Sequence, residues 1–555
     1  MGKSDRGCEL IPVLIAGGGP VGLVVALELG ARGVGCMVLN DKPDSAAHPK
    51  ANAIGARSME HLRRLGVAAD LRDKGLGDDH PTDVAYFTRL TGYELARLHM
   101  PSRRDALAEA GRGAGAWASP EPPHRCSQIF LEQQLKRRAA EMPEIDLRFG
   151  WRLTGLQETG DQVTAMAEEI ATGQTMTIMA DYVVGADGGN SITRKSLGIE
   201  FEGESGVVRP FMGGEMFAAY FRARPDRSWL SVDPSWQYWI VNPDIRALLI
   251  HVDEIDRFLL HTAIARDGGP AAMDPRNILA LMADAAIEID LLSAVPWTAG
   301  YSLVAQGYGS DRVFLAGDSA HLFTPTGGLG MNTGVDDAAN LGWKLAALCR
   351  GWGGPGLARS FELERRPIGL RNIDFARGFA NSVGTVPVTD EAERDSAAGR
   401  AERAALGDRL AAHAHGEFII PGIMLGVRYA GSPIVVEDDG HGAPPLDEPN
   451  SYIPNSFPGA RAPHLWLDPG VALYDKLGPE FTLLRFGRSG ADISGLREAA
   501  ALRGMPLAIL DVESDHARDL YGVDLALVRP DQHIAWRGNR APDDALALID
   551  RVRGA

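Results

Sequence analysis

The alternation of apolar and polar residues near the start of the chain predicts a strand, a turn and a helix. Residues 11–16 form a short apolar run, residues 17–22 are rich in glycine, and residues 23–29 carry apolar side chains at helical spacing. A second apolar run at 36–39 predicts the next strand. This order indicates a β-α-β unit, which is typical of a parallel sheet with helices packed against it.

Two later apolar strands also end in glycine turns. Residues 181–185 lead into an Asp-Gly turn, and residues 311–316 lead into Gly317 and Asp318, ahead of a glycine-rich loop and a helix expected over 336–348. Ligands of α/β sheets bind at the carboxyl ends of the strands. The carboxylate of Asp318 is therefore a candidate ligand contact.

The segment between these two strands has a different pattern. Its apolar stretches are rich in aromatic residues and alternate with a period of two, which predicts an antiparallel sheet with one buried face. The expected strands cover 217–222, 236–240 and 247–252.

The pattern changes again toward the C-terminus. Residues 391–413 are helical, Ala- and Arg-rich and resemble a connector, and residues 431–464 have the Pro, Gly and Asp content of a linker. A further α/β unit follows. Its expected strands are 481–486, 507–510, 526–529 and 533–536, and its expected helices are 496–503 and 541–552.

Composition narrows the class of protein. The 555 residues include 45% hydrophobic and 23% charged residues, which is ordinary for a globular chain. The length predicts about three or four domains. The 56 basic and 73 acidic residues give a net charge of −17, which argues against broad binding to nucleic acids or anionic membranes.

Cysteine usage predicts a reducing, cytoplasmic setting, because the 4 cysteines are scattered and form no CxxC pair. The uncharged stretch 10–27 is the one candidate membrane or signal segment. Its glycines, its prolines and its acidic flanks favour the strand, turn and helix instead. We predict no membrane span and no metal site.

Glycine is over-represented, at 65 of 555 residues, or about 12% against about 7% in average proteins. The first cluster reads Gly17-Gly-Gly19-Pro20-Val21-Gly22. In a GxGxxG turn the first glycine permits the tight turn, the second lets the backbone approach a pyrophosphate, and the third allows close helix–strand packing. The context between strand and helix predicts dinucleotide binding.

The position that usually carries a ribose-binding acid, at the end of the second strand, holds Asn40, and Asp41 follows it. An asparagine can also accept a hydrogen bond from a ribose hydroxyl. The sequence leaves open which of the two residues does so.

Together these motifs resemble the group A flavoprotein aromatic hydroxylases, the single-component FAD monooxygenases related to p-hydroxybenzoate hydroxylase. Within them the chain is most similar to the phenol, 2,4-dichlorophenol and 2-hydroxybiphenyl monooxygenase branch and its polyketide-tailoring relatives. The resemblance covers residues 10–375 strongly and the rest loosely. It is carried by the GxGxxG turn and by segments 49–60, 128–132, 187–194, 237–243 and 317–334.

The resemblance implies that FAD is the cofactor. By position in the family motifs, the FAD contacts would come from Gly17, Gly19, Pro20, Val21, Gly22, Asn40 or Asp41, Gln128, Gly317, Asp318, Pro325, Gly328, Gly330, Met331 and Asn332. Asp318 would bind the ribityl or pyrophosphate region, and the loop 325–332 would face the isoalloxazine.

Three further cofactor candidates leave alternatives open. Lys50 stands where the family usually has arginine, so a bidentate contact would become a point-charge contact. Asp187 either touches the pyrophosphate or NAD(P)H, or fixes its own turn. Arg125 lies just before Gln128 and could reach either the cofactor or an anionic substrate.

In the family an aromatic-rich sheet roofs the substrate cavity. Trp239 is the first choice for a pocket wall, with Tyr220 and His251 behind it, although all three also suit a plain core role. Asn52 occupies a position where one branch carries a histidine near the phenol, and its amide cannot act as a base. Pro325 belongs to the same candidate catalytic set, and no residue is assigned as general base.

The resemblance implies an α/β fold with a discontinuous Rossmann-like FAD domain at 1–80, 105–200 and 300–375. A mainly antiparallel substrate domain is expected at 81–104 and 201–299, and a helical connector and linker at 376–464. Residues 465–555 resemble the family's thioredoxin-like domain but contain no cysteine, so a structural or dimerisation role is expected. A homodimer fits that role.

The implied activity is hydroxylation of a phenolic or other electron-rich aromatic substrate. NADH or NADPH would reduce the flavin, O₂ would add at flavin C4a, and the C4a-hydroperoxyflavin would transfer OH to the ring. Only one GxGxxG is visible, so NAD(P)H is expected to bind transiently. The alternatives are Baeyer–Villiger or oxidative decarboxylation tailoring of an aromatic natural product and, more distantly, a non-catalytic flavin redox sensor.

Overall fold

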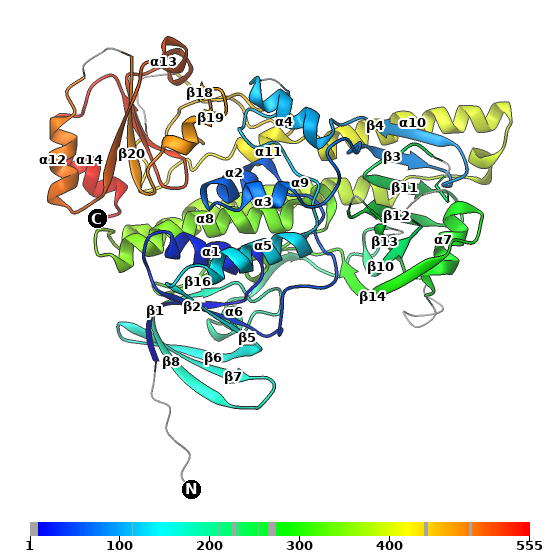
Figure 1. Cartoon of the computed structure of the whole chain (residues 1–555), viewed down its shortest axis with the longest axis horizontal. Helices are drawn as coiled ribbons and strands as arrows, with labels where there is room; N and C mark the ends of the chain where they lie inside the picture. The colour runs from blue at the N-terminus through cyan, green and yellow to red at the C-terminus, as the bar shows by residue number, and fades with distance from the viewer. Residues whose placement is uncertain are drawn as a thin grey trace, which may run out of the picture.

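The computed structural model describes residues 9–113, 115–209, 211–224, 229–230, 232–253, 255–264, 273–437, 442–487 and 491–555. Figure 1 shows a first sheet with helices on it, a second sheet beside it, and an α/β unit at the C-terminal end. The long helix α8 (Leu329–Cys349) runs through the middle of the molecule. No helix in the described ranges is long and apolar enough to cross a membrane.

The first sheet has the strand order β5-β2-β1-β8-β7-β6, and β16 also pairs with β8. The strands β5, β2, β1, β8 and β16 are parallel, and β6 and β7 extend the sheet in antiparallel fashion. The bounds are β1 Glu9–Ala16, β2 Cys36–Asn40, β5 Ile145–Phe149, β6 Trp151–Thr159, β7 Gln162–Glu169, β8 Thr175–Gly185 and β16 Val313–Leu315. The strands predicted at 11–16, 36–39, 181–185 and 311–316 are confirmed.

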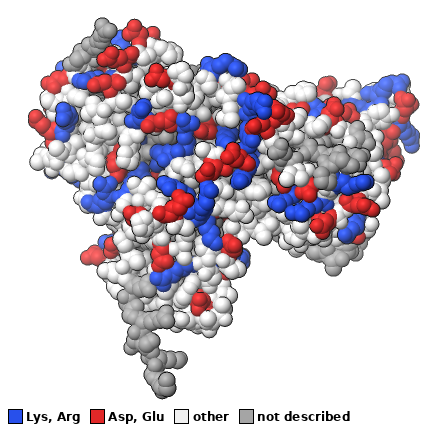
Figure 2. All heavy atoms as spheres, in the orientation of Figure 1, with Lys and Arg blue, Asp and Glu red and all other residues white. Residues whose placement is uncertain are grey.

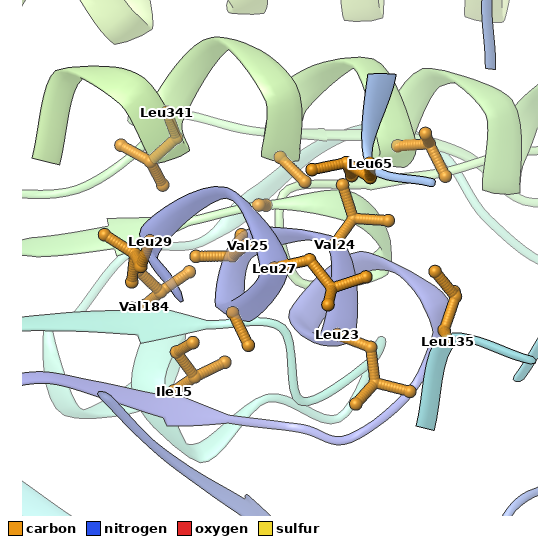
Figure 3. Close-up of a cluster of buried hydrophobic side chains, with 14 of the residues drawn as sticks. Ile15, Leu23, Val24, Val25, Leu27, Leu29, Leu65, Leu135, Val184 and Leu341 are labelled. Carbon is orange, nitrogen blue, oxygen red and sulfur yellow. The ribbon is translucent and has the colours of Figure 1, made fainter. Parts of the chain in front are cut away.

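Helix α1 (Pro20–Gly30) lies in the hydrophobic core over this sheet. Figure 3 shows Leu23, Val24 and Leu27 of α1 surrounded by side chains of β1, α5 and α8. Burying one such side chain contributes about 1.5–3 kcal/mol relative to leaving it exposed. The cluster therefore fixes the N-terminal end of α1 relative to the strand that precedes it.

Helix α8 begins at Leu329, seven residues before the predicted start at 336. The prediction was wrong because Gly330 and Gly334 suggested a loop, whereas both lie inside the helix. Gly334 is there for close packing, since a Cβ on it would lie 2.6 Å from a methyl group of Val21 in α1. The tertiary contact outweighs the low helix propensity of glycine.

The second sheet has the order β14-β10-β13-β12-β11-β3-β4 and is antiparallel except where β11 pairs with β3. The predicted strands exist, but the expectation of one buried face was wrong. Side chains of one face, among them Tyr86 and Trp239, belong to a buried cluster that also includes α10. The other face packs against α7 through Phe87 and Tyr238. The bounds are β3 Val84–Phe87, β4 Glu94–Leu98, β10 Gly214–Ala223, β11 Gln237–Val241, β12 Arg246–His251, β13 Arg257–Ala263, β14 Ile289–Ala299 and α7 Pro275–Ala283.

The C-terminal unit has the sheet order β21-β20-β22-β23, with β21 parallel to β20 and the others antiparallel. Its predicted strands and helices are confirmed, and α13 was missed. The bounds are β20 Phe481–Phe486, α12 Ser494–Leu502, β21 Leu507–Val512, α13 Asp515–Tyr521, β22 Leu525–Val528, β23 Ile534–Gly538 and α14 Ala545–Val552.

The remaining elements connect these three parts. Helix α10 (Ala397–Phe418) packs along β4 and contains most of the helical stretch predicted at 391–413. The others are α2 Ala56–Arg64, α3 Ala68–Arg72, α4 Arg103–Gly111, α5 Gln128–Ala140, α6 Ile192–Ser196, β9 Phe201–Glu204, β15 Ser302–Ala305, β17 His321–Leu322, α9 Gly356–Gly384, α11 Pro421–Leu425, β18 Trp466–Asp468 and β19 Val471–Ala472.

Acidic and basic side chains are intermixed over the face shown in Figure 2, and no extended patch of one sign stands out there. On this face, therefore, the acidic residues are not gathered into one patch.

Candidate active site

A cavity of about 1370 Å³ lies between the carboxyl ends of the first sheet's parallel strands and the inner face of the second sheet. Its lining includes Ala16 at the end of β1, Ala316 after β16, and Trp239 and Leu248 of the second sheet. Ligand pockets usually measure about 300–1,000 Å³. This cavity therefore has room for a dinucleotide and a second molecule.

One end of the cavity is the glycine turn before α1. Gly17 has a φ of +112°, and a Cβ on it would lie 2.0 Å from the Ala186 carbonyl oxygen. A Cβ on Gly19 would meet no protein atom within 4 Å, so the backbone there is open to the cavity. Gly19 caps α1 without any side-chain hydrogen bond, which leaves the N–H groups of the first turn available to an anion.

Asn40 and Asp41 both line this end of the cavity. The Asn40 Oδ1 accepts a hydrogen bond from the Gly18 N–H at 3.3 Å, so its side chain is fixed beside the turn. The Asp41 carboxylate is exposed and pairs with Lys42 at 3.3 Å. Lys50 also lines the cavity from an exposed position.

The loop that carries Lys50 is fastened to helix α5. The Glu132 carboxylate accepts from the Ala46 N–H at 2.7 Å and from the Gln128 Nε2 at 2.6 Å, and both side chains line the cavity. The predicted Gln128 thus stands at the wall, with its amide oriented by Glu132.

Asp318 projects its side chain into the cavity, where no described residue donates a hydrogen bond to it. Removal from bulk water raises the pKa of its carboxyl, and the charges of His321 and Lys50 oppose that rise. A carboxylate without protein donors suits hydroxyl donors from a ligand.

The N-terminal end of α8 faces the same space. Pro325, Gly328, Gly330 and Met331 all line the cavity. The Gly327 N–H donates to the Glu417 carboxylate of α10 at 2.8 Å, which ties the turn before α8 to the far wall.

Asp187 lines the cavity, and its carboxylate also holds its own turn together. It accepts from the Ser191 hydroxyl at 2.5 Å, from the Thr193 N–H at 3.0 Å and from the Thr193 hydroxyl at 3.1 Å. Asp187 therefore fixes its own turn, and its contact with the pyrophosphate or NAD(P)H stays a prediction.

Three predicted cofactor residues lie behind the cavity wall rather than on it: Gly22, Gly317 and Asn332. A Cβ on Gly22 would lie 1.9 Å from the Gly17 carbonyl oxygen, so this glycine serves packing. The Asn332 side chain accepts from the Gly55 N–H and the Ser58 hydroxyl at 2.7 Å each, and it donates to the Gly328 carbonyl at 2.7 Å. Both the oxygen and the nitrogen of this amide are therefore already hydrogen-bonded within the protein.

At the second-sheet end, Trp239 lines the cavity, as does Asn52. The Trp239 Nε1 donates to the Gln237 Oε1 at 2.8 Å, and its ring stacks on Tyr86 at 5.7 Å. The side chain is thus held rigidly as part of the wall.

Tyr220 and His251 are not part of the cavity lining. Tyr220 lies in the core cluster two residues beyond Ala218, which does line the cavity, and His251 lies on the opposite face of β12 from Ile250. The His251 ring stacks on Phe258 at 4.6 Å. Both residues are buried in the core, and a role for either in the substrate pocket stays a prediction.

Sequence reasoning missed a group of polar atoms on this wall. His48 Nε2, His261 Nδ1 and Trp297 Nε1 are buried without a hydrogen-bond partner among the described residues, and all three residues line the cavity. Burial lowers the pKa of His261 to about 3, so its imidazole is neutral at neutral pH. These residues come from distant segments, and their isolated positions gave no local signal.

Further lining residues also escaped prediction, and most of them are aromatic or apolar. They are Trp117, Met212, Trp236, Ile250, Val295, Glu417 and Phe418. The aromatic-rich segment 236–240 was the one available signal, and only Trp239 was chosen from it.

The described residues fit FAD. The open backbone at Gly19 and the uncapped start of α1 match a pyrophosphate, the unpartnered Asp318 carboxylate matches a ribityl chain, and the turn at Gly328 leaves space for a flat ring. The volume beyond, with its aromatic wall, can hold a second, aromatic molecule.

Comparison with known proteins agrees with this geometry. The model of the FAD binding domain family matches residues 10–376, and that of the aromatic-ring hydroxylase C-terminal domain matches residues 455–555. A relative from Emericella nidulans, the FAD-dependent monooxygenase apdD, is 31% identical over 98% of this chain and 90% of its own.

Two solved structures resemble the whole chain. RebC with bound 7-carboxy-K252c is 34% identical with a TM-score of 0.88, covering 99% of this chain and 100% of RebC. The ternary complex of aklavinone-11 hydroxylase with FAD and aklavinone is 27% identical with a TM-score of 0.81, covering 100% of both chains. The protein therefore belongs to the FAD-dependent aromatic-ring hydroxylases, a family of flavin monooxygenases.

Proposed function

We propose that the protein uses NAD(P)H and O₂ to hydroxylate a phenolic substrate of several fused rings. One observation carries this proposal. A single cavity of about 1370 Å³ joins the dinucleotide turn at Gly19 to an aromatic wall at Trp239. A single-ring phenol would fill a small part of the space beyond a flavin, whereas a multi-ring substrate would use it.

When bound, FAD supplies the exchange of two electrons with NAD(P)H and the activation of O₂. The chain binds and orients both molecules. The start of α1 holds phosphates, Asp318 holds hydroxyls, and the aromatic wall of Trp236, Trp239 and Trp297 stacks on the substrate and excludes water. The neutral His48 and His261 offer hydrogen bonds to phenolic oxygens on the same wall.

The proposal is tested with the FAD-loaded protein, NADH or NADPH, and a panel of phenols from single-ring to tetracyclic. We expect substrate-stimulated NAD(P)H oxidation that favours the larger phenols, and a product in which ¹⁸O from ¹⁸O₂ is bonded to an intact ring. Hydrogen peroxide is measured in parallel to correct for oxidation without hydroxylation.

Other products would change the assignment. Oxygen inserted into a ring, or loss of CO₂ from the substrate, would replace hydroxylation by Baeyer–Villiger or decarboxylating chemistry. Unstimulated NAD(P)H oxidation with every aromatic, despite bound FAD, would refute catalysis on such substrates.

A further inference from the structure

Arg125 lies in the segment before α5, and its side chain points toward the second sheet. The guanidinium carbon is 4.2 Å from the centre of the Trp236 ring, and Nη2 is 3.4 Å from the Met100 sulfur. Trp236 directly precedes β11, so the guanidinium lies at the substrate end of the cavity rather than at the glycine turn.

This guanidinium is half-buried and differs from three arginines that are fully buried in the protein. Arg365, Arg461 and Arg529 each pair with a buried carboxylate. Arg125 has no carboxylate within 4.0 Å among the described residues, and burial lowers its pKa to about 10. An arginine taken out of water without a counter-ion is costly unless a ligand supplies the anion.

The surroundings leave room for such an anion. Glu417 lines the same cavity; its Oε1 accepts from the Gly327 N–H at 2.8 Å, and its Oε2 lies 2.8 Å from His413 Nε2. A second cavity of about 60 Å³ is also lined by Arg125, together with Trp117 and Phe418. The guanidinium therefore lies between the large cavity and this small recess.

We propose that Arg125 is the specificity-determining residue that binds an ionised carboxylate on the aromatic substrate. The planar fork of guanidinium donors matches a carboxylate in bidentate fashion, and the Trp236 ring holds the guanidinium plane in place. The inference rests on the proposed function, because it assumes that an aromatic substrate occupies this end of the cavity. It narrows the substrate class to aromatic hydroxy acids.

The test is a binding measurement on the FAD-loaded protein, made without NAD(P)H. Matched acid and amide probes are titrated against the visible spectrum of the bound flavin: salicylate with salicylamide, 1-hydroxy-2-naphthoate with its amide, and a hydroxyanthraquinone carboxylate with its amide. We expect the wild type to prefer at least one acid over its amide by about tenfold or more.

In Arg125→Met that preference should vanish while amide affinity changes by less than about threefold, and Arg125→Lys should retain part of it. Arg104→Met, which removes an exposed arginine whose side chain is 62% accessible, should leave the preference unchanged. FAD content of each variant reports whether it has folded.

Three results would overturn the inference: no acid preference in any wild-type pair, an unchanged preference in Arg125→Met, or an equal loss of acid and amide binding in that variant. The last result would mean that Arg125 only supports the wall.

In the turnover assay, a rise in KM for NADPH but not for NADH in Arg125→Met would assign the guanidinium to the cofactor phosphate instead. Because binding is read without turnover, failure here is distinct from failure of the hydroxylation assay.

Discussion

Gly19 is a residue at which folding and cofactor binding make separate demands. Its φ of −79° and ψ of −174° are open to any residue, and a Cβ would meet no protein atom within 4 Å. Folding therefore does not require glycine here. The open space in front of it belongs to the cavity.

We predict that Gly19→Ala lowers FAD affinity by about tenfold or more and destabilises the apoprotein by no more than about 1 kcal/mol. The added methyl group would lie where the pyrophosphate approaches the backbone. FAD affinity is measured by titration of the apoprotein, and stability by urea unfolding. Gly111→Ala is the control, since a Cβ there also meets no protein atom but lies outside the cavity lining. Unchanged FAD affinity in Gly19→Ala would contradict the pyrophosphate assignment.

At the scale of elements, helices α1 and α8 approach each other through glycines of α8. A Cβ on Gly334 would lie 2.6 Å from a Val21 methyl group and 3.0 Å from the Gly317 Cα. A Cβ on Gly330, in the first turn of the same helix, would lie 3.7 Å from Phe323, which is an ordinary contact. The two glycines thus form a matched pair within one helix.

We predict that Gly334→Ala destabilises the apoprotein by about 1–3 kcal/mol because it overpacks the α1–α8 contact. Gly330→Ala should be neutral or stabilising by up to about 1 kcal/mol, because alanine has the higher helix propensity. Urea unfolding of both apoproteins checks the pair. Equal effects would mean that close packing does not explain Gly334.

At the scale of the whole molecule, the C-terminal unit is joined to the FAD-binding part by buried charges. Arg529 donates to Glu364 of α9 at 2.7 and 2.8 Å, and Lys344 of α8 donates to the same carboxylate at 2.7 Å. Both cations keep the pKa of Glu364 well below its usual range despite burial. The carboxylate therefore stays ionised and links three distant segments.

We predict that Glu364→Gln destabilises the protein by about 3–5 kcal/mol, because it leaves two buried cations with one fewer counter-ion. The surface pair of Asp395 and Arg400, with side chains 80% and 62% accessible, supplies the control. Asp395→Asn should cost less than about 1 kcal/mol. The free energy of unfolding in urea is the measurement, and similar losses in the two variants would refute a special role for the buried link.

The elements predicted well are those specified by local pattern. The strand, glycine turn and helix at residues 11–29 need only short-range signals, since turn chemistry and apolar spacing act over a few residues. Helix α8 was predicted too short because Gly330 and Gly334 suggested a loop, and Gly334 is explained by a contact with α1 that the local pattern does not contain.

The sequence by itself determined the flavoprotein family, the cofactor turn at Gly17–Gly22 and the aromatic character of the second sheet. Only the tertiary structure decided which residues meet the substrate. Strand alternation separates Ile250 from His251 but does not tell which face borders the cavity, since both faces of this sheet are buried. Likewise, the sequence shows that Arg125 is charged, but only packing shows that it lies half-buried beside Trp236 without a described carboxylate partner.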